Sequence, residues 1–201
     1  TKDLWEVDTN SAKNITITYN FYANQLDAGS CYLDEHQLYL NPVHCMFYIV
    51  NRMEEEYQLN MQIPTNYKIA SSMQQNNNVL SVKSYDLLAE SPIICSDSLQ
   101  NGSYDVDGIT FHLWFQGECK PDWEKLKKDF TAFTKSQIKY FGGFPVSEYH
   151  YFFQITPYRS YHGVEHTKNT VLLLGPGSEI MEKRYEDLLG ICSHELYHTW
   201  N

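Results

Sequence analysis

Short stretches in which apolar and polar residues alternate dominate the chain up to about residue 117. Such alternation predicts β-strands that bury one face and expose the other. The alternating segments are 15–22, 57–63 and 108–115, and the dense apolar run 44–50 is typical of a strand buried on both faces. Asn, Asp, Gly and Pro separate these segments, and the polar residues 74–78 predict a loop tip. This part of the chain therefore favours an antiparallel, sandwich-like arrangement.

The hydrophobic period changes at Pro121, which is typical of the start of a helix. Apolar residues then recur at helical spacing, and Gly142-Gly143 ends the predicted helix. We expect a strand at 149–155, a turn at 158–162 and a second strand at 164–174. The sequence thus predicts an α+β protein in which a β-rich N-terminal domain, residues 1–117, precedes a second domain, residues 118–201.

A last predicted helix follows Gly175-Pro176-Gly177, and Ser178 or Glu179 could begin it. Its apolar residues recur in steps of three and four and give the helix one side that faces the core. These residues are Tyr185, Leu188, Leu189, Cys192 and Leu196.

This helix carries the pattern with the most chemical content, His194-Glu195-Leu196-Tyr197-His198, an H-E-x-x-H motif. Residues four apart lie on one face of a helix, so His194 and His198 can present two imidazole nitrogens to one Zn²⁺. Glu195 can then act as a general base toward water at the metal. The simpler interpretation is a solvated helix face that carries two histidines and a glutamate.

A catalytic zinc usually has three protein ligands and one open position. The motif supplies two of them, and the chain stops at Asn201. Any ligand that lies downstream of this helix is therefore missing from these residues.

Composition narrows the classes of function. Hydrophobic residues make up 42% of the 201 residues, which is enough for real cores. The net charge of −10 argues against nucleic acid or anionic lipid as a partner, and we find no apolar run long enough for a membrane span. The five cysteines form no C-x-x-C pair, and their odd number fits neither a disulfide scaffold nor a cysteine zinc site.

Three motifs together resemble the glycyl aminopeptidase family of zinc metallopeptidases. The segment from His194 to Asn201 has the family's H-E-x-x-H-x-W-N form. The family's G-G-x-E-H segment is resembled by His162-Gly163-Val164-Glu165-His166. Glu165 precedes His194 by 29 residues. Ser84 to Ile93 resembles its Y-D-x-L-x-D-S-P motif. The chain departs from the family at His162, where the family has Gly, and at Glu90, where it has Asp. A larger side chain at His162 puts the family's substrate preference in question.

The resemblance implies a peptide substrate, a zinc cofactor and a second domain like the first half of a thermolysin-like catalytic domain. It implies His194 and His198 as metal ligands, Glu195 as the catalytic base, and Glu165 as the carboxylate that binds the substrate's free α-amine. Gly163 would let the substrate backbone approach the strand edge, and His166 would lie at the substrate. The family's third ligand is a Glu on a later helix, so we expect this chain to be the N-terminal portion of a longer peptidase and inactive by itself.

Three functions remain open at this stage. The first is an aminopeptidase that releases a small N-terminal residue such as glycine, in line with the resemblance. The second is an endopeptidase in which Glu165 has only a structural role. The third is a non-catalytic domain that binds peptides. The resemblance suggests a periplasmic or otherwise exported protein, and a cytoplasmic location stays open as the alternative.

Overall fold

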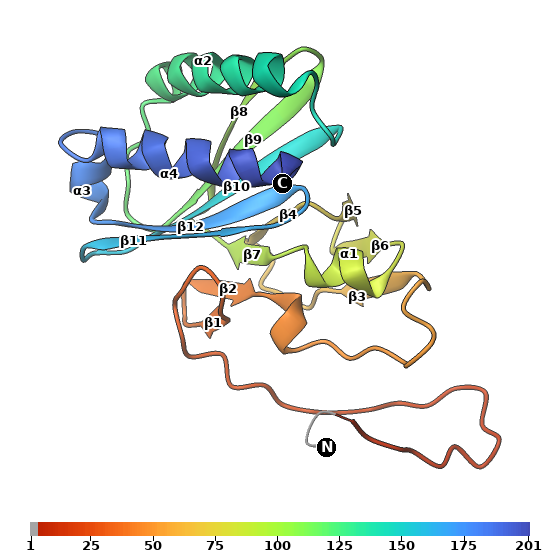
Figure 1. The fold of residues 1–201 in the computed structure, drawn as a ribbon. Coiled ribbons are helices and arrows are strands. Elements are labelled where there is room, and N and C mark those ends of the chain that lie inside the picture. The colour runs from red at the N-terminus through yellow and green to blue at the C-terminus, as the bar shows by residue number, and fades with distance from the viewer. Residues whose placement is uncertain (1–3) are drawn as a thin grey trace.

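The computed structural model describes residues 4–201 and confirms the predicted α+β class, with sandwich-like antiparallel sheets in the first half of the chain (Figure 1). None of the helices within these residues is long and apolar enough to cross a membrane.

Two antiparallel sheets form the N-terminal part. The four-stranded sheet has the order β1-β2-β7-β4, which are Tyr32–Leu33, Gln37–Leu40, Ile93–Ser96 and Lys68–Ser71. The three-stranded sheet has the order β3-β6-β5, which are Tyr57–Asn60, Val79–Val82 and Gln74–Asn76. Side chains alternate along β7, so Ile93 and Cys95 pack toward Leu80 of the three-stranded sheet while Ile94 faces the other way. The short helices η1 (Pro42–His44) and α1 (Tyr85–Ala89) lie in the connections.

A five-stranded mixed sheet forms the rest of the β-structure. Its order is β11-β12-β10-β9-β8, which are Ser160–Glu165, Asn169–Gly175, Glu148–Ile155, Ile109–Gln116 and Gln100–Val106. The central strand β10 runs parallel to both β9 and β12, and the two outer pairs are antiparallel. Strands β8 and β9, which precede residue 117, therefore share one sheet with the strands that follow it.

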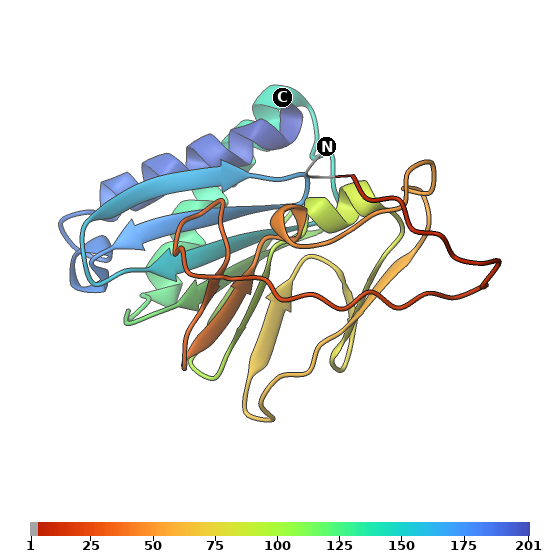
Figure 2. The same ribbon diagram turned by 90° about the horizontal axis from the view of Figure 1, so that it is seen from below.

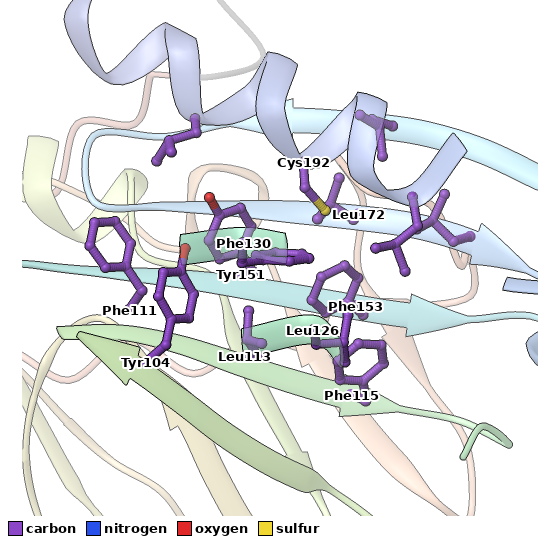
Figure 3. Packing of buried hydrophobic residues seen from close by; sticks show 14 of the residues in the cluster. Tyr104, Phe111, Leu113, Phe115, Leu126, Phe130, Tyr151, Phe153, Leu172 and Cys192 are labelled. Atoms are coloured by element: carbon purple, nitrogen blue, oxygen red, sulfur yellow. The ribbon is translucent and has the colours of Figure 1, made fainter. Parts of the chain in front are cut away.

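Both faces of this sheet are covered, which explains the nearly continuous apolar run of β10. On one face, Tyr151 and Phe153 join a core with helices α2 (Trp123–Phe141) and α4 (Tyr185–Tyr197), which is drawn in Figure 3. On the other face, Phe152 packs with Tyr39 and Ile94 of the four-stranded sheet. Figure 2 shows the resulting order of layers, with the blue helix on the far side of the sheet from the N-terminal strands.

The sequence predicts helix α2 well. The side chain of Asp122 accepts a hydrogen bond from the backbone N–H of Lys125 and so caps the first turn. Gly142 ends the helix in the left-handed conformation, with φ of 81°.

Two of the expected N-terminal strands are wrong. Residues 15–22 form no strand, and Ile15, Ile17, Tyr19 and Phe21 are between 42% and 48% exposed. Residues 44–50 are irregular after η1, and Tyr19 packs edge-on against Phe47 with 4.8 Å between ring centroids. Alternation describes which side chains could share a face, but a strand also needs a partner strand, which no local pattern supplies.

Other boundaries need smaller corrections. Strand β3 is shorter than predicted, and part of the expected loop at 74–78 is strand β5. The expected strand 164–174 is a hairpin, because β11 ends at Glu165 and β12 begins at Asn169. The expected helix start at Ser178 or Glu179 falls in a separate short helix, α3 (Gly177–Ile180), and α4 begins only at Tyr185.

Candidate functional site

Helix α4 brings the two motif histidines together. His194 lies in its last turn, and His198 follows its end as the first residue of the 3-10 helix η2 (His198–Trp200). The Nε2 atoms of the two rings lie 3.2 Å apart. Two ligands of one tetrahedral zinc at about 2.0–2.1 Å from the metal would be separated by roughly 3.3 Å. The two nitrogens therefore already have the spacing of a shared metal.

Packing at both ends of this motif fixes its position. The side-chain amide of Gln137 on α2 donates hydrogen bonds to the carbonyl oxygen and the hydroxyl of Ser193, at 2.8 and 2.9 Å. After the motif, the indole N–H of Trp200 donates to the carbonyl oxygen of Gly143 at 2.8 Å, and its ring stacks on Phe141. The helix that carries His194 is thus attached to α2 on either side.

Glu195, the carboxylate of the motif, is buried, with 5% of its surface exposed. Its Oε2 atom is buried and has no hydrogen-bond partner among the described residues. Burial raises the pKa of the Glu195 carboxyl above its usual value. The neighbouring His194 and His198 lower this pKa, and the negative charge of Glu165 raises it further. An unpaired buried carboxylate costs stability, and this one is retained beside two potential metal ligands.

Strand β11 lies against α4 and contributes the next two residues. Oxygen or nitrogen ligand atoms of Glu165, Glu195 and His198 all lie within 4.8 Å of one another. Gly163, two residues before Glu165, faces the same way, and a Cβ added there would lie closer than 3.0 Å to the Glu195 carboxylate. Gly163 thus leaves room for the side chain of Glu195 itself, which the sequence did not reveal.

His166 and His162 lie on the other side of this strand. His166 is buried, and its Nδ1 lies 3.4 Å from Glu90 Oε2 at the end of α1. His162 Nδ1 lies 2.6 Å from Asp27 Oδ1. The structure therefore groups Glu165 and Gly163 with the motif, whereas it directs His166 and His162 toward the N-terminal part.

A second group of possible metal ligands, His112, Glu148 and His150, lies on β9 and β10. The indole N–H of Trp114 donates to His150 Nδ1 at 3.2 Å. A neutral imidazole that accepts at Nδ1 carries its hydrogen on Nε2 and has no lone pair there for a metal. This group is therefore less suited to a metal than the one on α4.

Comparisons with known proteins concern the fold of the chain and its first 97 residues. Residues 1–97 match the family model of the Peptidase M61 N-terminal domain, a match that ends one residue after β7. A search of curated proteins finds no match to the chain.

Among solved structures, the chain is similar to an aminopeptidase N family protein from Idiomarina loihiensis, with 24% identity and a TM-score of 0.80 over 90% of this chain. It is also similar to an M1 zinc metallopeptidase from Deinococcus radiodurans, with 10% identity and a TM-score of 0.53 over 90% of this chain. The chain spans 33% and 43% of the lengths of these two structures. It therefore has the fold of the corresponding part of these structures, and its first 97 residues match the Peptidase M61 N-terminal domain.

Proposed function

We propose that this chain contributes to the active site of a zinc-dependent metallo-aminopeptidase. The observation that carries the proposal is the spacing of 3.2 Å between the Nε2 atoms of His194 and His198, with the buried Glu195 between them in sequence. Two imidazoles and a nearby carboxylate form a donor set of the kind that catalytic zinc uses. When bound there, zinc would supply Lewis acidity toward a peptide carbonyl and toward water.

His194 and His198 would hold the metal through Nε2. Glu195 would serve as the base, because its Oε2 has no hydrogen-bond partner among residues 4–201 and is free to take up a proton. Burial, which raises the pKa of this carboxyl, increases its basicity. The carboxylate would then hold the proton at Oε2 until the leaving amine accepts it.

Glu165 would determine that the enzyme acts on N-terminal residues. An ammonium group taken out of water needs a carboxylate partner, and Glu165 is exposed at the end of β11 next to the motif. Binding of the free α-amine at Glu165 would set the first peptide bond at the metal. The resemblance of the G-x-E-H segment supports a small first residue such as glycine.

The nearness of Glu165 to His198 also allows another role, as a third metal ligand. The two roles exclude each other, because a carboxylate that is bound to the metal cannot also neutralise the substrate amine. Glu165→Gln separates them. If Glu165 binds the amine, the variant keeps its zinc and loses activity. If Glu165 is a metal ligand, the variant loses its zinc.

The test uses the full-length protein that contains this chain, with glycyl and alanyl amides and the same amides acetylated at the amine as substrates. An aminopeptidase cleaves only the free amides, and Glu165→Gln loses this cleavage while it keeps its zinc. Cleavage of the blocked substrates by the wild type would instead support an endopeptidase. Zinc binding without cleavage of any of them would support a non-catalytic, peptide-binding protein.

We further propose that residues 1–201 alone bind zinc weakly and lack peptidase activity, because Glu165 would bind the substrate amine and so leave His194 and His198 without a third ligand among the described residues. Titration of the isolated chain with zinc tests this. Tight, stoichiometric binding with turnover would show that the proposal is wrong.

A further inference from the structure

Two cysteines that lie apart in the sequence meet beneath the loop that precedes β1. Cys31 Sγ lies 3.5 Å from the carbonyl oxygen of Asn41, and Cys45 Sγ lies 3.8 Å from the same oxygen. The two thiols therefore lie against the same backbone oxygen. Both side chains are buried, with 4% and 9% exposure. No other pair of cysteines among residues 4–201 has such a contact in common.

The surroundings of Cys31 favour its thiolate. The backbone N–H of Asn41 donates to Cys31 Sγ at 3.2 Å. The neighbouring Cys45 thiol lowers the pKa of Cys31, although burial works against this. The neighbouring Cys31 and burial together raise the pKa of Cys45. One sulfur is thus the better nucleophile and the other remains a thiol.

Solvent reaches this pair through a pocket. A pocket of about 430 Å³ is lined by Cys31 and His44 together with residues of the extended N-terminal segment, among them Phe21 and Tyr22. Cys31 is in its wall, and Cys45 is not. A small molecule that enters the pocket therefore meets Cys31 first.

We propose that Cys31 and Cys45 form a redox-active dithiol that closes to a disulfide by exchange with a small-molecule disulfide. The Cys31 thiolate attacks one sulfur of that molecule, whose S–S bond breaks and releases one thiolate. Cys45 then loses its proton and attacks the Cys31 sulfur, which releases the second thiolate. Two protein thiols are oxidised, and one disulfide is reduced to two thiols.

Formation of the Cys31–Cys45 disulfide would affect β11, the strand that contributes to the candidate site. The loop just before Cys31 contains Asp27, which pairs with His162 on β11, and Gly29, whose carbonyl oxygen lies 2.6 Å from His44 Nε2. A covalent link from Cys31 to Cys45 would tie this loop to η1. It would thereby hold the contact between the N-terminal part and β11 more firmly.

The test uses the folded wild-type chain, treated with glutathione disulfide at neutral pH. The chain is then unfolded in denaturant, its remaining thiols are blocked with N-ethylmaleimide, and it is digested with chymotrypsin, which can cleave after Tyr39 between the two cysteines. The expected product is a Cys31–Cys45 crosslinked peptide, lighter by two hydrogen atoms than its two halves, with Cys95, Cys119 and Cys192 alkylated. A stable glutathione adduct on the partly exposed Cys119, with Cys31 and Cys45 both alkylated, would overturn the proposal.

A second measurement needs no oxidation. The rate of Cys31 alkylation by iodoacetamide at neutral pH is compared among the wild type, Cys45→Ser and Cys45→Ala. Serine keeps an O–H donor and alanine removes it, so we expect alkylation in the alanine variant to be about tenfold slower than in the serine variant. Equal rates in all three proteins would show that Cys45 does not activate Cys31.

Discussion

Gly163 on β11 lies directly against Glu195 on α4, so close that a Cβ at position 163 would overlap the carboxylate. The absence of a side chain in the strand is therefore what allows the buried Glu195 to occupy its position beside His194 and His198. This contact joins the two sequence motifs physically, and it makes the strand part of the support for the proposed base.

Gly163→Ala should displace the Glu195 carboxylate, because the added carbon would lie closer than 3.0 Å to it. In the full-length protein we expect turnover to fall by at least about tenfold, since a misplaced general base loses much of its typical ~10²–10⁴-fold contribution. Gly190→Ala is the matched control. Its added carbon would meet only Tyr161 Oη at 3.8 Å, an ordinary contact. Equal turnover in both variants, measured on a glycyl amide, would contradict the proposed contact.

Glu195→Gln should keep the metal and lose the base. Glutamine has the same size and fits the same buried space, so the two histidines should keep their positions. We expect normal zinc content and turnover lower by ~10²–10⁴-fold in the full-length protein. The exposed Glu186 on the same helix supplies the control substitution Glu186→Gln. Loss of zinc from Glu195→Gln would instead identify Glu195 as a ligand.

His194→Ala and His198→Ala should each remove most of the zinc, because each deletes one of the two nitrogens that are 3.2 Å apart. Metal analysis of the purified full-length protein measures the effect. The control is His112→Ala in the second group of possible ligands, and it should leave the zinc stoichiometry unchanged. If zinc is lost only in the control, the metal is bound by β9 and β10 rather than by α4.

The contact between Glu90 and His166 should make stability depend on pH. His166 lowers the pKa of Glu90 below its usual value of 4.5, burial opposes this, and the Thr167 N–H adds to it. A carboxyl whose pKa is lowered by folding stabilises the folded state at pH values above its usual pKa. This stabilisation is lost as the pH falls through the folded-state pKa. The free energy of unfolding should therefore decrease below about pH 4.5.

Denaturant unfolding at a series of pH values measures this, and Glu90→Gln should make the acid decrease less steep. The change should be less than about 1 kcal/mol, since the Glu90 side chain is 43% exposed. Glu54→Gln, at an exposed site, serves as the control. An unchanged slope in Glu90→Gln would show that other groups cause the acid sensitivity.

The N-terminal segments show that local hydrophobic patterns do not suffice to predict strands. Residues 15–22 alternate as a strand does, yet Ile15 and Ile17 lie unpaired and about half exposed. The apolar run 44–50 has strand composition, yet it follows η1 as irregular chain. In contrast, β9 and α2 were predicted within a few residues, because burial of one face and capping by Asp122 and Gly142 are properties of the neighbouring residues themselves.

The sequence by itself determined the α+β class, the long helix before Gly142 and the helical spacing of His194 and His198, because helix periodicity, capping and ligand spacing are local properties of the chain. Only the tertiary structure decided that β8 and β9 join β10 in one sheet, that Gly163 makes room for Glu195, that His166 turns toward Glu90, and that Cys31 and Cys45 meet at the carbonyl oxygen of Asn41. These contacts join residues from separate elements, and their free energy depends on how sheets and helices pack, which no short window of sequence specifies.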